Sequence, residues 1–140
     1  MAISYIRQAK ERLKHAKEAL NERNYPYVIR QSQEAVELSL KACLRIVGIE
    51  PPKFHDVSPI LKKNSFLFPE WFRQKIDKMA SISRSLRRER ETAMYGDEEL
   101  LLPPDEIYTF EDAKEAFEGC YFIIKLSEKL INEHKEKEND

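Results

Sequence analysis

Arginine is concentrated in one short stretch, "SRSLRRERETAMYGDEE", which runs from Ser83 to Glu99. Its arginines are Arg84, Arg87, Arg88 and Arg90. At helical spacing, Arg84 and Arg88 share a face with Glu91 and, two turns beyond Arg88, with Tyr95. Clustered guanidinium groups suit phosphate because their planar donors match its oxygens. One prediction from this stretch is therefore a site that binds phosphate or nucleotide through all four arginines, Arg84, Arg87, Arg88 and Arg90, with Tyr95 stacking on a base.

A solvated helix end is the simpler interpretation of the same residues. Cations near the C-terminus of a helix interact favourably with its dipole, and Arg87 and Glu91 have the spacing of an i,i+4 ion pair. Arg90 differs, because helical spacing places it on the apolar stripe of this helix. An unpaired buried charge costs too much free energy, so we expect Arg90 to pair with Glu34 or Glu37, or to lie in a subunit interface.

Other polar residues form no recognisable catalytic motif. Glu37 and Lys41 have the spacing of an intrahelical ion pair. His55, in "PPKFHD", precedes a short predicted helix and is typical of local capping. No set of His, Cys, Asp or Glu has the spacing of metal ligands, and no glycine-rich phosphate loop is present. The sequence therefore predicts neither a metal site nor a cofactor.

The composition is typical of one soluble helical domain. A chain of 140 residues can bury a core without covalent cross-links. Because 24 Lys and Arg nearly balance 25 Asp and Glu, nucleic-acid binding would need a local basic patch. Cys43 and Cys120 stand among apolar residues and are expected to be buried free thiols. The charged N-terminus and the lack of a membrane-length apolar run predict a cytoplasmic protein without a membrane partner.

Hydrophobic periodicity predicts four long helices and one extra short helix. The long helices are expected at residues 3–21, 26–47, 70–95 and from a Thr109–Asp112 capping box to His134. The short helix begins with Ser58 as N-cap and Pro59 at its first position, and residues 97–108 are expected to be loop. We therefore predict an all-α, up-down four-helix bundle, with residues 1–134 as a single domain and 135–140 as a frayed tail.

Two segments carry a resemblance to a known family. They are "SQEAVELSLKACLRIVGIEPPKFHDVSPIL" and "RSLRRERETAMYGDEE". Together with the order of the helices, they resemble the HEPN domain family over nearly the whole chain. The resemblance implies a compact helical bundle that forms symmetric homodimers. It also implies RNA chemistry, because many members are metal-independent ribonucleases with an R-x4-6-H motif at the dimer cleft.

One branch of the family pairs with a small nucleotidyltransferase in toxin–antitoxin systems and carries the motif R-x4-H-x-Y, whose tyrosine the partner adenylylates. In this chain Arg88 takes the place of the arginine and Tyr95 that of the tyrosine, but Ala93 stands where the histidine should be. Alanine cannot transfer a proton as imidazole does near neutral pH. The resemblance therefore predicts the fold of the family and the residues around its motif, but no efficient nuclease activity.

Three hypotheses follow from these patterns. The first is a dimeric module that binds RNA or nucleotide and acts with a minimal nucleotidyltransferase-like partner. The second is a ribonuclease toxin in which Tyr95 or Glu91 substitutes for the missing acid/base, beside Arg88. The third is a structural dimerisation module. The sequence leaves enzymatic activity open, and cleavage of RNA in EDTA would separate the second hypothesis from the others.

Overall fold

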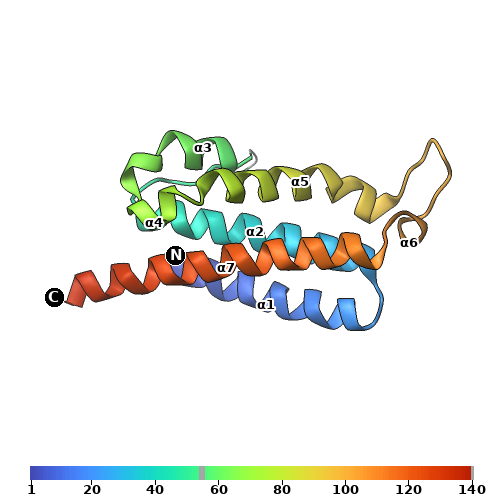
Figure 1. The fold of residues 1–140 in the computed structure, drawn as a ribbon, viewed down its shortest axis with the longest axis horizontal. Coiled ribbons are helices and arrows are strands. Elements are labelled where there is room, and N and C mark those ends of the chain that lie inside the picture. Colours follow the sequence, from blue (N-terminus) through green and yellow to red (C-terminus); the bar gives the residue numbers. More distant parts are fainter. Residues whose placement is uncertain (54–55, 140) are drawn as a thin grey trace.

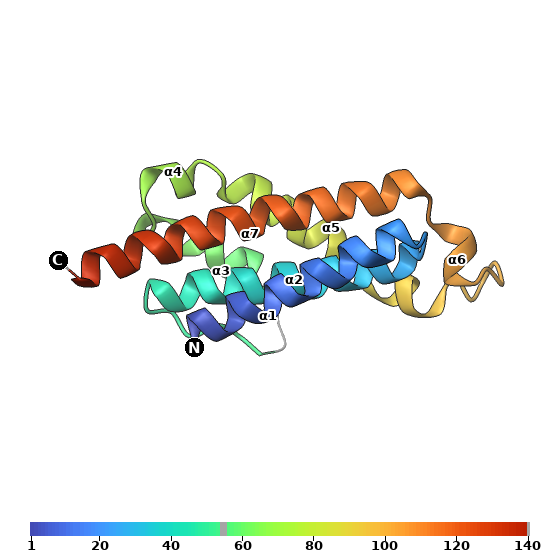
Figure 2. The same ribbon diagram turned by 90° about the horizontal axis from the view of Figure 1, so that it is seen from below.

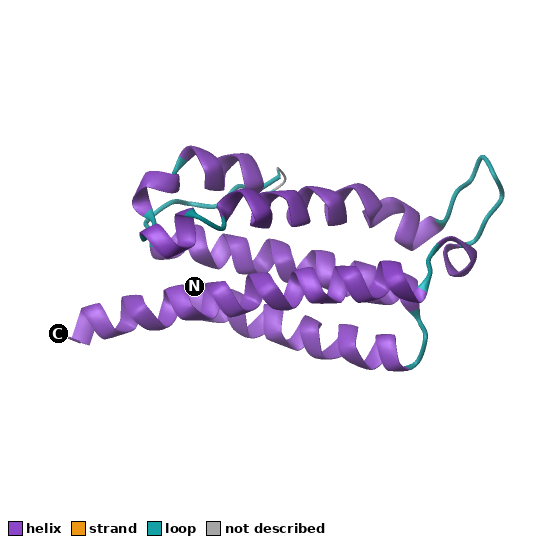
Figure 3. Ribbon diagram, viewed as in Figure 1, coloured by secondary structure: helices purple, strands orange, loops and turns teal. Residues whose placement is uncertain are grey.

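The computed structural model describes residues 1–53 and 56–139. Four long helices form the body of the molecule: α1 (Ala2–Asn21), α2 (Tyr25–Ile46), α5 (Ile76–Tyr95) and α7 (Phe110–Asn139). Consecutive long helices run in opposite directions (Figure 1). Figure 3 shows helices joined by loops, and the described residues contain no strand, only an isolated bridge between Asp97 and Leu102. The predicted all-α, up-down bundle is confirmed.

Helix α2 lies at the centre of the bundle. It packs against α1, α5 and α7, which bury it on several sides. Its buried side chains include Val28, Val36, Leu40 and Leu44. Helix α1 covers one of these sides through small residues such as Ala9 and Ala16, which allow the two backbones to approach closely. Figure 2 shows α7 alongside them, with its C-terminal part extending beyond the other helices. A helix with so wide an apolar arc needs several neighbours to cover it.

The helix predicted at residues 70–95 is in fact two helices. A short helix, α4 (Glu70–Arg73), ends at a turn that contains Gln74 and Lys75, and α5 begins after it. Just before this turn, Phe68 and Phe72 are buried in the core and stack with ring centroids 4.4 Å apart. No Gly or Pro marks this break. It results from tertiary packing, which local sequence does not report.

Four further features differ from the prediction. Helix α3 (Ser58–Lys63) begins at Ser58 rather than being capped by it, and Asp56 Oδ1 accepts the Ser58 backbone N–H at 3.1 Å. The short 3-10 helix η1 (Ser65–Leu67) follows α3, and α6 (Pro104–Ile107) lies within the expected loop. Helix α7 continues past His134 to Asn139, because the Lys- and Glu-rich sequence there favours helix and contains no breaker.

Several local predictions are confirmed. Thr109 Oγ1 accepts the backbone N–H of Asp112 at 3.2 Å, and Asp112 Oδ2 accepts that of Thr109 at 3.0 Å, so the capping box at the start of α7 is present. Cys43 and Cys120 are buried free thiols. Burial raises the pKa of each thiol to about 12, so both stay protonated at neutral pH. The Cys43 thiol donates to Ser127 Oγ at 3.2 Å.

Candidate functional site: the arginine helix

The solvent face of α5 carries the residues that helical spacing grouped together. The side chains of Arg84, Arg88, Glu91 and Tyr95 are all exposed, and Tyr95 is 65% exposed at the end of the helix. Within the described residues, neither Arg84 nor Arg88 takes part in an ion pair. Two guanidinium groups one turn apart on a single face can contact phosphate oxygens of one bound molecule. We call Arg84, Arg88 and Tyr95 the outer face of α5.

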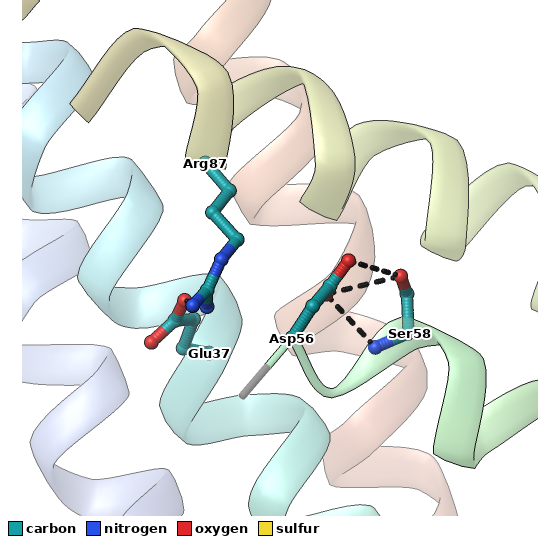
Figure 4. A network of polar contacts seen from close by, with 4 residues as sticks. All are labelled: Glu37, Asp56, Ser58 and Arg87. Carbon is teal, nitrogen blue, oxygen red and sulfur yellow. Dashed lines mark hydrogen bonds and ion pairs between the residues drawn. The ribbon is translucent and has the colours of Figure 1, made fainter. Parts of the chain in front are cut away.

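Arg87 lies on a different side of the same helix. Its Nη1 donates to Glu37 Oε1 of α2 at 2.7 Å, and the two side chains are 33% and 20% exposed. Figure 4 shows this pair between the two helices, with the Asp56 carboxylate turned toward Ser58 at the start of α3. The pair links α5 to α2 through a short, charge-assisted hydrogen bond. Arg87 therefore has a structural partner that the sequence analysis did not assign to it.

This geometry corrects several predicted pairs. Arg87 points to Glu37 rather than to Glu91, and within the described residues no ion pair joins Glu37 to Lys41. Arg90, expected to be partly buried, is exposed. Glu34 pairs instead with Arg12 of α1, Nε to Oε2 at 3.3 Å. Although Arg90 begins on the apolar stripe, its long side chain reaches solvent, as amphipathic side chains do.

Ala93 faces the opposite way from the arginines around it. It is only 2% exposed and belongs to the hydrophobic core, between the exposed residues Arg88 and Tyr95. Five residues along a helix correspond to roughly 140° of rotation, so position 93 cannot lie on the same face as Arg88. A side chain at position 93 therefore meets the core and not the outer face of α5.

A cavity of about 400 Å³ lies beside the outer face, between α5, α6 and α7. Its polar lining residues are Ser81, Ser85, Glu89, Tyr108, Asp112 and Glu115. The Tyr108 hydroxyl donates to Glu89 Oε2 at 2.8 Å. Burial, together with the hydrogen bond to Glu89 and the charges of Glu89 and Asp112, raises the pKa of Tyr108, so this phenol remains a donor at neutral pH.

The cavity lining is acidic, and carboxylates repel phosphate. The cavity therefore disfavours anionic ligands, whereas the outer face favours them, although both border α5. Sequence analysis missed the cavity, although the four-residue spacing of Ser81, Ser85 and Glu89 marks one polar stripe. Asp112 had been assigned only to the capping box, and Tyr108 to a loop. Asp112 and Glu115 of α7, together with Tyr108 before it, are brought beside α5 by the tertiary fold.

The remaining aromatic and histidine residues considered for a site either pack and hydrogen-bond within the fold or lie outside the described residues. Phe72 is fully buried in the core. Trp71 is half-buried, its indole Nε1 donates to Glu133 Oε2 at 3.0 Å, and Lys129 lies over its ring. His55 lies outside the described residues. Among the residues described, no cluster of His, Cys, Asp and Glu could hold a metal ion.

Comparison with known families gives a match over most of the chain. The model of the HEPN domain matches residues 2–130. The chain belongs to the HEPN domain family. No curated protein and no solved structure matches it. None of the helices in the described residues of this HEPN domain is long and apolar enough to cross a membrane. The matched region contains the whole arginine helix and ends within α7.

Proposed function

We propose that this HEPN domain binds RNA or nucleotide phosphate at the outer face of α5. Arg84 and Arg88 provide two exposed guanidinium groups on that face, and Arg90 adds a further exposed charge nearby. The protein is almost neutral overall, with a formal charge of −1, so this local cluster is what would attract a polyanion. Arg87, which the sequence analysis included among the phosphate ligands, contributes mainly by joining α5 to α2 through Glu37.

The same proposal holds that the domain is not an efficient ribonuclease. The observation that carries this part is the identity of position 93, which is alanine. The family motif has histidine at the position that corresponds to residue 93, whereas this chain has an alanine there that is buried in the core. A general acid/base must lie within hydrogen-bond reach of the proton that it transfers. The methyl group of Ala93 has no proton to transfer.

The biological setting that we propose is a homodimer acting with a small nucleotidyltransferase-like protein in a toxin–antitoxin-like pair. Tyr95 would be the contact point with that partner. It is 65% exposed and lies at the C-terminal end of α5, where an enzyme could reach its hydroxyl. This tyrosine would either stack on a bound base or accept a nucleotidyl group.

RNA binding and cleavage test the first two parts of the proposal together. Fluorescently labelled single-stranded RNA is titrated with the wild-type protein in EDTA at low salt, and the RNA is then checked for cleavage. We expect weak binding and intact RNA. The variant Arg84→Ala with Arg88→Ala should bind roughly tenfold more weakly, which corresponds to about 1.4 kcal/mol. Its control is Lys14→Ala with Lys17→Ala, two exposed lysines on α1.

Equal affinities for the wild type and the arginine variant, with unchanged helicity, would show that the outer face is only a solvated surface. Efficient cleavage in EDTA that Arg88→Ala abolishes would favour a ribonuclease with a substitute acid/base. The partner is tested by co-expression with a nucleotidyltransferase encoded beside this gene, followed by intact-mass measurement. Tyr95→Phe should remove any added nucleotide, whereas Tyr121→Phe, which changes another exposed tyrosine, should not.

A further inference from the structure

Lysine ammonium groups lie over aromatic rings on the side of α7 that meets α4 and α5. Lys129 Nζ is 4.1 Å from the centre of the Trp71 ring, and Lys78 Nζ of α5 is 4.1 Å from that of Phe122. A third lysine, on α7, lies 5.3 Å from the ring centre of a tyrosine one turn before it. We call these side chains the lysine–aromatic face: Trp71, Lys78, Tyr121, Phe122, Lys125 and Lys129.

The members of this face adjoin one another on one surface of the bundle. At roughly 100° per residue, positions 121, 122, 125 and 129 of α7 fall within an arc of about 100°. Trp71 of α4 is held on that side because its indole Nε1 donates to Glu133 Oε2 at 3.0 Å, one turn beyond Lys129. Lys78 reaches the same side from α5 through its contact with Phe122. Three helices therefore contribute to one surface that combines cations and aromatic rings.

The three lysines of this face are exposed, and among the described residues none of them has a carboxylate partner. Two neighbouring acids of α7 are engaged elsewhere: Glu128 pairs with Lys10 of α1, and Glu133 accepts the indole N–H of Trp71. A cation–π contact at an exposed site is a weak interaction. Each ammonium group can therefore exchange its ring for a phosphate at little cost.

The rings beneath the lysines match unpaired bases. Trp71 packs edge-to-face against the buried Phe72, with ring centroids 5.7 Å apart, which fixes the orientation of the indole. When Lys129 moves to a phosphate, the ring face that it covers becomes available for stacking. Bases stack on aromatic side chains whatever their sequence, whereas the bases of a duplex are already stacked and paired. The face therefore suits a single strand.

We propose that the lysine–aromatic face binds single-stranded nucleic acid, with its three lysines on phosphates and a base stacked on Trp71. This inference rests on the proposed function and specifies the ligand as an unpaired strand. The surface is separate from the outer face of α5, because Lys78 lies about 15 Å along the helix from Arg88 and about 80° around it. The two surfaces therefore contribute to affinity separately, and each can be removed without the other.

Trp71 is the only tryptophan in the chain, so its fluorescence reports on this surface alone. The wild-type protein is titrated with oligouridylate at low salt in EDTA. Stacking of a base on the indole should quench the emission in a saturable manner. An RNA duplex of the same length, and inorganic polyphosphate, which has no bases, should quench it little. Equal quenching by polyphosphate would overturn the stacking role, since charge alone would then explain the change.

A charge-matched pair of variants tests the lysines. Lys125→Gln with Lys129→Gln should weaken the binding of labelled oligouridylate roughly tenfold at low salt, because two phosphate contacts are lost. The control is Lys14→Gln with Lys17→Gln, which removes the same charge from exposed positions of α1 and should keep the wild-type affinity. Equal losses in both variants would show a general effect of net charge and overturn the proposal.

The variant Arg84→Ala with Arg88→Ala separates this inference from the proposed function. It should bind oligouridylate more weakly than the wild type, yet at saturation Trp71 should be quenched to the same extent. If this variant loses affinity while the emission of Trp71 never changes and the lysine variant binds like the wild type, the inference fails and the proposed function stands. A wild-type protein that binds no oligouridylate in anisotropy titrations would disprove both.

Discussion

Arg87 and Arg88 are neighbours in the chain, yet they belong to different parts of the molecule. Arg87 turns toward α2 and is held by Glu37 at 2.7 Å, whereas Arg88 is exposed on the outer face of α5. One residue of helix corresponds to roughly 100° of rotation, which is enough to move a side chain from an interhelical contact to solvent. The sequence presents one arginine cluster, and the fold divides it into a structural arginine and a set available to ligands.

The same division separates Ala93 from Tyr95. Ala93 is packed in the core, and Tyr95, two residues later, is 65% exposed on the outer face. Within this chain, the helix therefore places the position of the motif histidine on the inner side and the position of the motif arginine on the outer face. The difference between the inner and outer sides of α5 is therefore the basis of the following predictions.

The largest effect is expected from placing an imidazole on the inner side. Ala93→His should destabilise the domain by about 1–3 kcal/mol in urea denaturation, because the larger ring must enter a packed core. It should not create ribonuclease activity. Glu91→His places the same ring on the outer face and should change stability by no more than about 0.5 kcal/mol. A stable Ala93→His protein that cuts RNA in EDTA would show that position 93 reaches the arginines.

The next effect concerns the pair that fixes α5 to α2. Arg87→Ala or Glu37→Ala should each cost about 1–2 kcal/mol, between the values for exposed and buried ion pairs, because both side chains are partly covered. The double variant should cost less than the sum of the two single changes, since neither charge is then left unpaired. Lys114→Ala provides the control, because its pair with Glu118 is exposed on both sides. Additive costs would mean that the pair contributes nothing.

A smaller effect is expected at the acidic cavity on the third side of α5. Tyr108→Phe removes the hydrogen bond to Glu89 and should cost about 0.5–1.5 kcal/mol. The folded state raises the pKa of Tyr108 above its ordinary value of 10.0, so the unfolded chain loses this proton first as pH rises. Stability from this group is therefore present below pH 10 and falls above it. Above pH 10, the Tyr108→Phe variant should lose stability less steeply than the wild type as pH rises. Tyr121→Phe should follow the wild type.

Much of this architecture could be predicted from local patterns. The capping box of Thr109 and Asp112, the buried thiols and the solvent exposure of Arg84 and Arg88 follow from spacing over a few residues. Helical periodicity fixes which residues share a face, and short-range capping fixes where a helix begins. These features depend on contacts within one helix, so the sequence contains what is needed to infer them.

The features that were missed depend on contacts between helices. The break at Gln74 and Lys75 follows the stacked, buried pair of Phe68 and Phe72, and no local signal marks it. Glu37 has Lys41 at the right spacing on its own helix, yet it pairs with Arg87, fifty residues away. A guanidinium that approaches from a neighbouring helix replaces the ammonium one turn along the same helix. Such choices require knowledge of which helices are adjacent.

The smallest effect expected concerns the salt dependence of RNA binding and leaves stability unchanged. Each phosphate contact with a single strand contributes roughly −0.7 to the slope of log K against log salt. If Arg84 and Arg88 each contact one phosphate, replacing both by alanine should make the slope shallower by about 1.4. Titrations at several salt concentrations measure this directly. Because Arg87 is held by Glu37, Arg87→Lys should keep the wild-type slope if the domain stays folded. A slope that changes with Arg87→Lys and not with Arg84→Ala and Arg88→Ala would reverse the roles of the inner and outer sides of α5.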